Sequence, residues 1–193
     1  VVVDYISTCP QPITVSAVAT SYDWIQLDWL PGGLETLWQV VAVPSGSSPT
    51  AGVPVQVTSH PYNIGGLAEN TLYDVFVKAI CSTDDESPWS VATTVKTSCS
   101  PVNELPYTED FNQYSYQVSC PDCWTFPVTF NTYPKIYLNN YGYYGMETMS
   151  LVFASDTLTS PVAVTPAFDA DIHSLRAQFR ISADHDFIAG CME

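Results

Sequence analysis

Side chains that could make or break bonds are few in this sequence, and their spacing fits no catalytic motif. The chain has three histidines, His60, His173 and His185, and none stands in the His-Glu-x-x-His spacing that holds a catalytic zinc ion. No Gly-x-Ser-x-Gly elbow and no glycine-rich phosphate-binding motif occurs. A Cys–His nucleophile pair stays open, because a sequence does not show which side chains meet in space. We expect no active site within these residues.

Six cysteines could form disulfides, bind a metal or carry redox chemistry: Cys9, Cys81, Cys99, Cys120, Cys123 and Cys191. An even number in a chain poor in lysine and rich in tyrosine predicts an oxidising compartment. The Cys-x-x-Cys spacing of Cys120 and Cys123 would suit redox work or metal binding beside a helix. No helical pattern follows and no second such pair occurs. We therefore favour structural disulfides, with six buried free thiols as the alternative.

Carboxylates dominate the charge of the chain. Twenty aspartates and glutamates face five lysines and arginines, which gives a formal net charge of −15. This charge repels nucleic acid and anionic membrane surfaces, and it favours hard cations such as calcium. No apolar run reaches membrane-spanning length, so we expect no membrane insertion.

Tyrosines cluster around two asparagines and a glycine in the second half of the chain. The candidates for ligand contact are Tyr141, Tyr143 and Tyr144. Aromatic rings beside amides can stack on sugar rings, which would make a glycan the ligand. The alternative is a long loop that packs its own tyrosines onto a sheet.

Short alternating segments separated by turn residues must position these side chains. Within residues 9–99 we expect seven strands and very little helix: 13–18, 24–29, 37–43, 53–57, 61–64, 73–79 and 91–96. Seven short strands in about ninety residues predict a sandwich of two sheets. The fold class is therefore all-β.

Residues 9–99 resemble a fibronectin type III domain. The resemblance rests on an opening Cys9-Pro10-Gln11-Pro12, a strand that ends in Trp29, and a turn that runs from Leu67 to Tyr73. It implies that Trp29 fills the space between the sheets and that the Tyr73 hydroxyl bonds upstream backbone. In this topology the start of the first strand and the end of the sixth lie at one pole, so we favour a Cys9–Cys81 disulfide.

A polar linker, 100–104, precedes a second resemblance over residues 105–193. The motifs LPYTEDF, CW, SLVF, AVTPAF and SLRAQFRI, in this order, resemble the jelly-roll modules of bacterial cleaved adhesins, which are related in shape to MAM domains. We expect the jelly roll to be truncated, since it offers five or six strands where about eight are needed. Residues 1–8 resemble the closing strand of a preceding module, so we expect a longer precursor that alternates the two kinds of module.

Two site predictions follow from this second resemblance. Structural calcium would be held by Glu109 and Asp110 on the first strand of the jelly roll, with Asp169 and Asp171 in a turn. Asn112 stands where the family usually has glutamate, and the alternative is a set of solvated turn carboxylates. A bond from Cys99 to Cys120 or Cys123 would stiffen the domain junction, and Cys191 would pair with whichever remains.

The resemblance implies a non-catalytic binding or spacer segment of a secreted or cell-surface, adhesin-type protein of bacteria that use the type IX route. Its partners would be an extracellular protein or glycan and other domains of the same polypeptide. Two alternatives stay open. The modules could be accessory domains of an extracellular protease or glycosidase, or the jelly roll could itself recognise carbohydrate.

Overall fold

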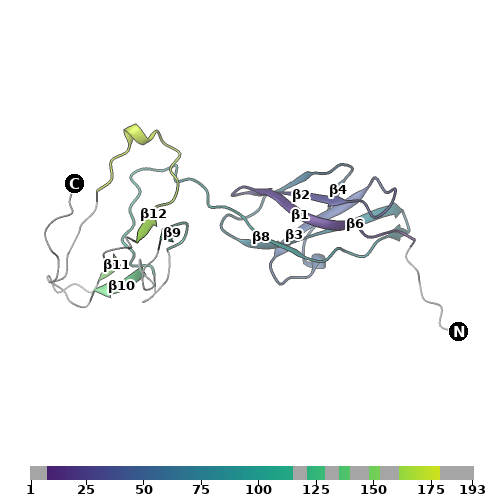
Figure 1. Cartoon of the computed structure of the whole chain (residues 1–193), viewed down its shortest axis with the longest axis horizontal. Coiled ribbons are helices and arrows are strands. Elements are labelled where there is room, and N and C mark those ends of the chain that lie inside the picture. Colours follow the sequence, from purple (N-terminus) through teal and green to yellow (C-terminus); the bar gives the residue numbers. More distant parts are fainter. Residues whose placement is uncertain (1–7, 115–120, 129–134, 140–147, 153–160, 179–193) are drawn as a thin grey trace.

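The computed structural model describes residues 8–114, 121–128, 135–139, 148–152 and 161–178. Figure 1 shows a β-sandwich at the N-terminal end, followed by a smaller group of strands. We refer to residues 9–98 as the sandwich and to residues 99–178 as the C-terminal segment. Within the described residues the only helical elements are two short 3₁₀ turns, η1 (Pro49–Ala51) and η2 (Ile172–Ser174). The all-β prediction is confirmed.

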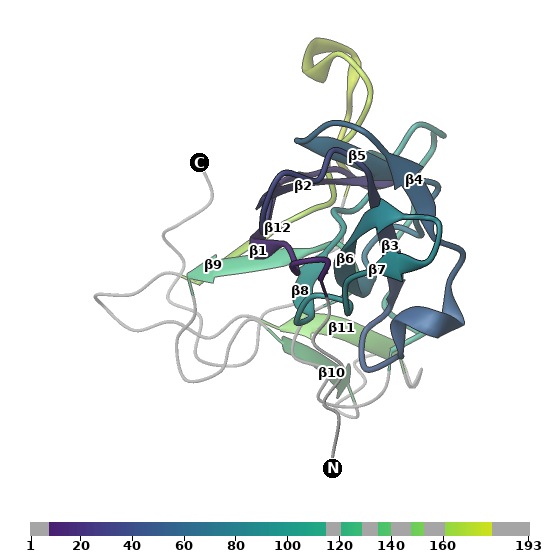
Figure 2. The same ribbon diagram turned by 90° about the vertical axis from the view of Figure 1, so that its right-hand side faces the viewer.

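Eight strands build the sandwich. They are β1 (Ile13–Thr20), β2 (Trp24–Leu30), β3 (Trp38–Pro44), β4 (Val55–Val57), β5 (Tyr62–Gly65), β6 (Leu72–Ser82), β7 (Asp85–Glu86) and β8 (Thr93–Lys96). One sheet has the order β1-β2-β5, and the other has the order β4-β3-β6 with β8 and β7 both paired to β6. All these pairs are antiparallel. Figure 2 looks at the sandwich end-on. The predicted sandwich of two antiparallel sheets is confirmed.

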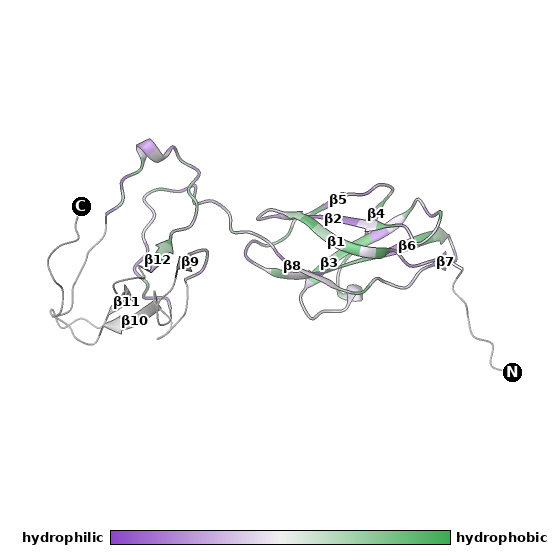
Figure 3. Cartoon of the chain, in the orientation of Figure 1, coloured by the Kyte–Doolittle hydropathy of each residue, from purple (hydrophilic) through white to green (hydrophobic). Residues whose placement is uncertain are grey.

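The core lies between the two sheets and is built from alternate residues of the central strands. Ile25, Leu27 and Trp29 point inward from β2 and are almost fully buried. Trp29 meets Trp38 of β3 edge to face, with ring centroids 5.7 Å apart. The hydropathy colouring of Figure 3 shows apolar residues gathered on the strands of the sandwich. Period-two alternation therefore produces the buried layer, as expected for sheets that face each other.

The β4-β3-β6-β8 sheet is also covered on its outer face. Val41, Val43 and Phe76 are buried there, and Trp89 packs against them. Gly52, just after η1, lies so close that a Cβ atom added to it would be 2.7 Å from a Val41 methyl group. The loop between β3 and β4 thus lies over the sheet. This cover explains why β3 is apolar on both faces rather than alternating.

Strand β8 begins two residues later than predicted, because serine side chains replace strand pairing before it. The Ser87 and Ser90 hydroxyls accept hydrogen bonds from the backbone N–H groups of Ala79 (2.9 Å) and Val77 (3.1 Å) on β6. Backbone bonds from Ser87 N to Ala79 O and from Ser90 N to Val77 O complete the contacts. The backbone N–H and carbonyl groups of Val77 and Ala79 on β6 are therefore hydrogen-bonded without a regular neighbouring strand.

The C-terminal segment has two pairs of antiparallel strands among its described residues. β9 (Thr125–Val128) pairs with β12 (Val162–Val164), and β10 (Lys135–Asn139) pairs with β11 (Thr148–Val152). Tyr137 of β10 is in register with Ser150 of β11.

The predicted first strand of the jelly roll, which was to carry Glu109 and Asp110, does not form. The structure has no strand over residues 105–111. Glu109 and Asp110 instead accept hydrogen bonds from the backbone N–H groups two residues ahead, those of Phe111 (2.7 Å) and Asn112 (3.0 Å). Such local bonds compete with strand pairing. Residues 175–178, the part of the SLRAQFRI motif that follows η2 in the described residues, form no strand either.

Candidate functional site: the junction after the sandwich

A loop closed by a tyrosine precedes β6 and forms the sandwich's side of the junction. The Tyr73 hydroxyl accepts a hydrogen bond of 2.9 Å from the backbone N–H of Ala68. Leu67 is half-buried and packs against the core cluster that contains Trp29 and Tyr73. Asn70 has a φ of 50°, a left-handed conformation that asparagine tolerates in turns. The loop over residues 68–71 is thus anchored to the core at its start.

The end of β8 is bonded into the same loop. The hydroxyl of Thr97, which is 2% exposed, donates to the carbonyl oxygen of Ala68 at 2.7 Å and accepts from the backbone N–H of Thr71 at 3.0 Å. The backbone N–H of Asn70 donates to the carbonyl oxygen of Ser98 at 3.0 Å. These bonds fix the position where the chain leaves the sandwich.

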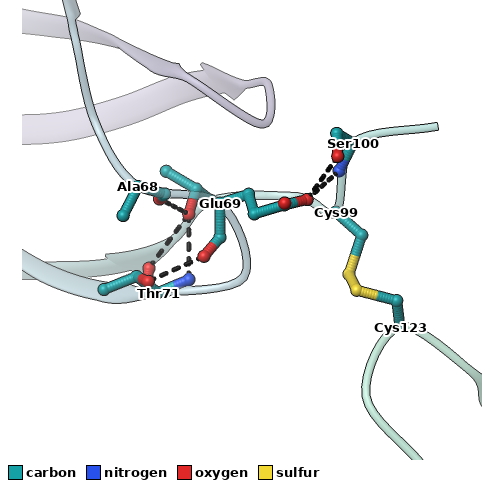
Figure 4. Close-up of a disulfide and its surroundings, with 7 residues drawn as sticks. Ala68, Glu69, Thr71, Cys99, Ser100 and Cys123 are labelled. Carbon is teal, nitrogen blue, oxygen red and sulfur yellow. Dashed lines mark hydrogen bonds between the residues drawn. A yellow bond between two sulfur atoms is a disulfide. The ribbon is translucent and has the colours of Figure 1, made fainter. Parts of the chain in front are cut away.

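Glu69 extends this hold to the first residue of the linker. Its Oε2 accepts hydrogen bonds from the backbone N–H of Ser100 at 2.5 Å and from the Ser100 hydroxyl at 2.6 Å. The hydroxyl bond, followed by the backbone bond, lowers the pKa of the Glu69 carboxyl, because both donors favour its ionised form. Figure 4 shows the carboxylate reaching from the loop to Ser100.

A disulfide next to this bond ties the exit of the sandwich to the C-terminal segment. Cys99 is bonded to Cys123, with their Cα atoms 5.7 Å apart. Cys123 lies in a turn, with a φ of 64°, where the backbone N–H of Trp124 donates to the carbonyl oxygen of Pro121 at 3.2 Å. Of the two partners that the sequence left open for Cys99, the structure has Cys123.

The second disulfide lies at the other end of the sandwich. Cys9 is bonded to Cys81, with Cα atoms 5.6 Å apart, which is the pair that the sequence favours. Cys9 is 1% exposed and belongs to the core cluster. This bond closes the pole where β1 starts and β6 ends.

The linker is also fixed on its far side. Val102 forms a parallel β-bridge with Phe168, in which its N–H donates to the Ala167 carbonyl at 2.8 Å and its carbonyl accepts from Asp169 N–H at 3.0 Å. Tyr107 packs edge to face on Phe168, with ring centroids 5.6 Å apart. Residues 100–104 are therefore a bonded connection rather than a free tether.

Between these contacts lies a hollow of about 620 Å³. Among the described residues that line it, the charged side chains are the carboxylates of Glu69, Glu104, Glu109 and Asp122, with no lysine, arginine or histidine. Tyr114 also lines it, and its pKa is raised by burial and then by the negative charge of Glu109 and, to a smaller extent, of Asp122.

The predicted calcium ligands do not converge in the described part of the chain. No group of three or more His, Cys, Asp or Glu side chains with metal-site geometry occurs among those residues. The carboxylates of Glu109, Asp110 and Asp171 each accept a hydrogen bond from backbone N–H two residues ahead. Asp169 is exposed. Structural calcium stays a prediction.

His60 is the one histidine with a described side-chain hydrogen bond, and its partner is a carboxylate. Its Nδ1 lies 2.7 Å from Asp28 Oδ1, and its ring packs against Trp29 and Trp38 with centroid distances of 5.1 and 5.6 Å. Neither a cysteine nor a serine is hydrogen-bonded to this ring among the described contacts. The arrangement supports the core of the sandwich.

Several candidates lie outside the described residues: Cys120, Tyr141, Tyr143, Tyr144, His185 and Cys191. Sequence analysis missed Glu69, Ser100 and Thr97, because each reads as an ordinary turn or linker residue. The sequence could have brought them together only through the sandwich topology, in which the loop over 68–71 and the end of β8 are neighbours. Among the described residues no helix is long and apolar enough to span a membrane.

No protein-family model and no curated protein matches the chain. Solved structures similar to it include the FN5 domain of Drosophila Lar, at 24% identity and TM-score 0.40, covering 47% of this chain and 99% of that one. The FN1–FN3 domains of chicken CNTN1 match at 24% identity and TM-score 0.40, covering 45% of this chain and 30% of that one. The fn3 domain of the human collagen alpha-1(XX) chain matches at 21% identity and TM-score 0.40, covering 52% and 91%. The fold described above is established by the strand pairing of this chain and does not depend on these matches.

Proposed function

We propose that this chain is a non-catalytic spacer and binding segment of a secreted or cell-surface multidomain protein of the adhesin type. The observation that supports this most is the bonded junction. Cys99–Cys123 and the Glu69–Ser100 hydrogen bonds hold the C-terminal segment to the sandwich's exit. A spacer needs this property, because its task is to hold neighbouring modules and their loops in a fixed direction.

The two disulfides support an extracellular setting for this role. Cys9 and Cys81 are 72 residues apart. In the chain-entropy model, the bond between them lowers the entropy of the unfolded chain and so stabilises the folded state by about 4 kcal/mol. The Cys99–Cys123 bond, with a separation of 24 residues, contributes about 3 kcal/mol on the same basis. Such bonds persist in oxidising compartments and resist unfolding and proteolysis there.

The acidic charge of the chain favours one kind of partner. A chain with a net charge of −15 and an acidic hollow at its junction favours association with a protein surface that carries basic residues. We propose an extracellular protein partner of this kind, together with other modules of the same polypeptide. The adhesin-type jelly roll over 105–193 and secretion by the type IX route belong to the same proposal.

Small-angle X-ray scattering tests the spacer role. The oxidised chain should scatter as one elongated particle with a narrow distribution of shapes, whereas the Cys99→Ser/Cys123→Ser double variant should sample a broader range of maximum dimensions. A Ser47→Ala variant, in the turn after β3 and far from the junction in sequence, serves as a control. Equal flexibility in the oxidised chain and the double variant would count against a rigid spacer.

A further inference from the structure

The outer face of the β1-β2-β5 sheet carries a row of aromatic and polar side chains from β2. Because Ile25, Leu27 and Trp29 point into the core, the residues between them point to the opposite, outer face. That row is Trp24, Gln26, Asp28 and Leu30. The half-buried Trp24 belongs to neither hydrophobic cluster of the described residues, so its ring lies on the surface of the sheet and not in the core.

Strand β5 leaves open the position beside Trp24. Gly65 is paired directly opposite Trp24, and residues paired in this way lie on the same face of an antiparallel sheet. A Cβ atom added to Gly65 would be 4.0 Å from Trp24 Cβ and 3.9 Å from the Asp23 carbonyl oxygen, which is ordinary contact. This position therefore has room for a ligand group next to the indole ring.

Two amide side chains follow Trp24 on the same face. Gln26 Nε2 donates a hydrogen bond of 2.8 Å to Oδ1 of Asn63, its partner in register on β5. This bond orients both amides, and it uses one of the two Gln26 donors and none of the Asn63 donors. Among the described contacts, the Gln26 carbonyl oxygen and the Asn63 NH₂ group therefore remain available to hydroxyl groups, which both donate and accept.

The face is nearly uncharged, although the chain as a whole is strongly acidic. Within β1, β2 and β5, which the structure describes in full, Asp28 is the one residue with a charged side chain. Its Oδ1 lies 2.7 Å from His60 Nδ1. With a net charge of −15 on the chain, a polyanion would be repelled, and a polycation would be drawn to the acidic surfaces elsewhere. The ligand that this face complements is an uncharged one.

We propose that the outer face of the β1-β2-β5 sheet binds a neutral glycan, with a pyranose ring stacked on Trp24 and hydroxyl groups bonded to Gln26 and Asn63. One side of a pyranose ring presents C–H groups, which the electron-rich face of an indole attracts. Successive outward positions on a strand are about 7 Å apart, so the amides reach hydroxyl groups of the stacked sugar or of its neighbour. None of these residues lines the junction hollow, so glycan binding goes beyond the spacer function and does not depend on it.

Affinity electrophoresis of the full oxidised chain tests the proposal. Native gels contain one of three neutral polysaccharides, hydroxyethyl cellulose, arabinoxylan or galactomannan, or no polysaccharide. We expect at least one of the three to retard the chain relative to the gel without polysaccharide. Trp24→Ala should weaken this binding about tenfold, because it removes the stacking surface. Gln26→Ala and Asn63→Ala should each weaken it severalfold through the loss of hydrogen bonds.

A Gly65→Val variant tests the same face without removing any of its side chains. The backbone leaves room for a Cβ atom there, and β-branched residues suit strands, so the sandwich should keep its melting temperature. The added side chain would fill the position beside Trp24 and should abolish the retardation. Val53→Ala is the control, because Val53 is 88% exposed and precedes β4 of the other sheet. It should be retarded like the parent chain.

Failure of the glycan site would look different from failure of the spacer role. Equal mobility in all four gels would overturn the proposal, as would retardation that persists in a folded Trp24→Ala or Gly65→Val variant. Retardation lost only in a Tyr143→Ala/Tyr144→Ala double variant would place the glycan site elsewhere in the chain and refute this one. Each of these results leaves the scattering test of the junction unaffected.

Discussion

Glu69 and Ser100 are joined by two hydrogen bonds to one carboxylate oxygen, at 2.5 Å from the backbone N–H and 2.6 Å from the hydroxyl. Glu69 lies in the loop that Tyr73 closes, and Ser100 is the first linker residue. The pair therefore holds the start of the linker in a fixed position relative to the sandwich core.

Removing the Glu69 carboxylate should loosen the linker without unfolding the sandwich. In Glu69→Ala we expect the Ser100 amide to exchange its hydrogen about fivefold faster, because it loses a charge-assisted acceptor. Hydrogen exchange followed by NMR measures this. Glu104→Ala, which removes a carboxylate from the same hollow with no described bond to Ser100, is the matched control. Unchanged exchange at Ser100 would contradict the role of Glu69.

The same pair should respond to acid. The pKa of Glu69 is lowered from its ordinary value of 4.5. Above that pH the ionised carboxylate therefore contributes fully to the protection of the Ser100 amide. The contribution is lost as pH falls through the lowered folded value. Ser100 protection should therefore be constant from neutral pH to about pH 5 and fall in stronger acid, and Glu69→Gln should remove this dependence. Protection that falls between pH 7 and 5 would point to another group.

Asp74 should make the sandwich sensitive to acid as well. This buried carboxylate accepts from the Thr94 hydroxyl (2.6 Å), the Gly46 N–H (2.7 Å) and the Ser45 hydroxyl (3.1 Å). The Thr94 bond, then the Gly46 bond, lowers its pKa below 3.8, against the opposing effect of burial. Stability from Asp74 is present above pH 3.8 and lost as pH falls through the lower folded value.

Urea unfolding at pH 7 and in stronger acid measures this dependence. Asp74→Asn should lower the pH 7 midpoint and narrow the difference between the two conditions. Asp84→Asn, in the exposed turn after β6, should behave like the parent chain. Equal pH dependence in Asp74→Asn and the parent would refute the assignment.

Gly52 should tolerate no side chain. A Cβ atom there would stand 2.7 Å from Val41 Cγ2 and 2.8 Å from Val43 Cγ1, both on the covered face of the sheet. Gly52→Ala should destabilise the sandwich by about 1–3 kcal/mol, the usual range for overpacking. The matched control is Gly65→Ala, where the nearest atoms are 3.9 Å and 4.0 Å away. Equal melting temperatures for the two variants would contradict this packing.

The Tyr73 hydroxyl and the Trp29 ring should differ in their contributions to stability. Tyr73→Phe removes only the bond from Ala68 N–H, an exposed residue that water can reach, so we expect a loss of about 1 kcal/mol. Trp29→Ala leaves a cavity in the core and should cost about 3–5 kcal/mol. Tyr22→Phe, at a side chain that is 44% exposed, is the control. A Tyr73→Phe loss as large as that of Trp29→Ala would refute the ranking.

Sequence patterns predicted most of the sandwich because its strands are bounded by turns and its core residues alternate. Trp24 to Trp29 is the clearest case, and β2 spans Trp24–Leu30. The two-residue strand β7 was missed because a segment this short has no period. The second buried face of β3 could not be foreseen either, since it depends on a loop folding back over the sheet.

Predictions were weaker in the C-terminal segment because local bonds there override the strand pattern. The resemblance to jelly-roll modules predicted a strand over Leu105–Phe111, but the Glu109 and Asp110 carboxylates satisfy nearby N–H groups and turn the chain. The Cys99 partner could be narrowed only to Cys120 and Cys123, since just two residues lie between them and pairing depends on tertiary geometry.

The spacing of the linker's attachments has an evolutionary consequence. Ser100 is held by Glu69 on one side and Val102 is paired beside Phe168 on the other, so Pro101 alone separates the two anchors. An inserted or deleted amino acid here would move either Ser100 away from Glu69 or Val102 out of its pairing with Phe168. A recombination that moved this sandwich into another array would therefore have to carry the downstream anchors along, which makes the heritable unit larger than the folded one.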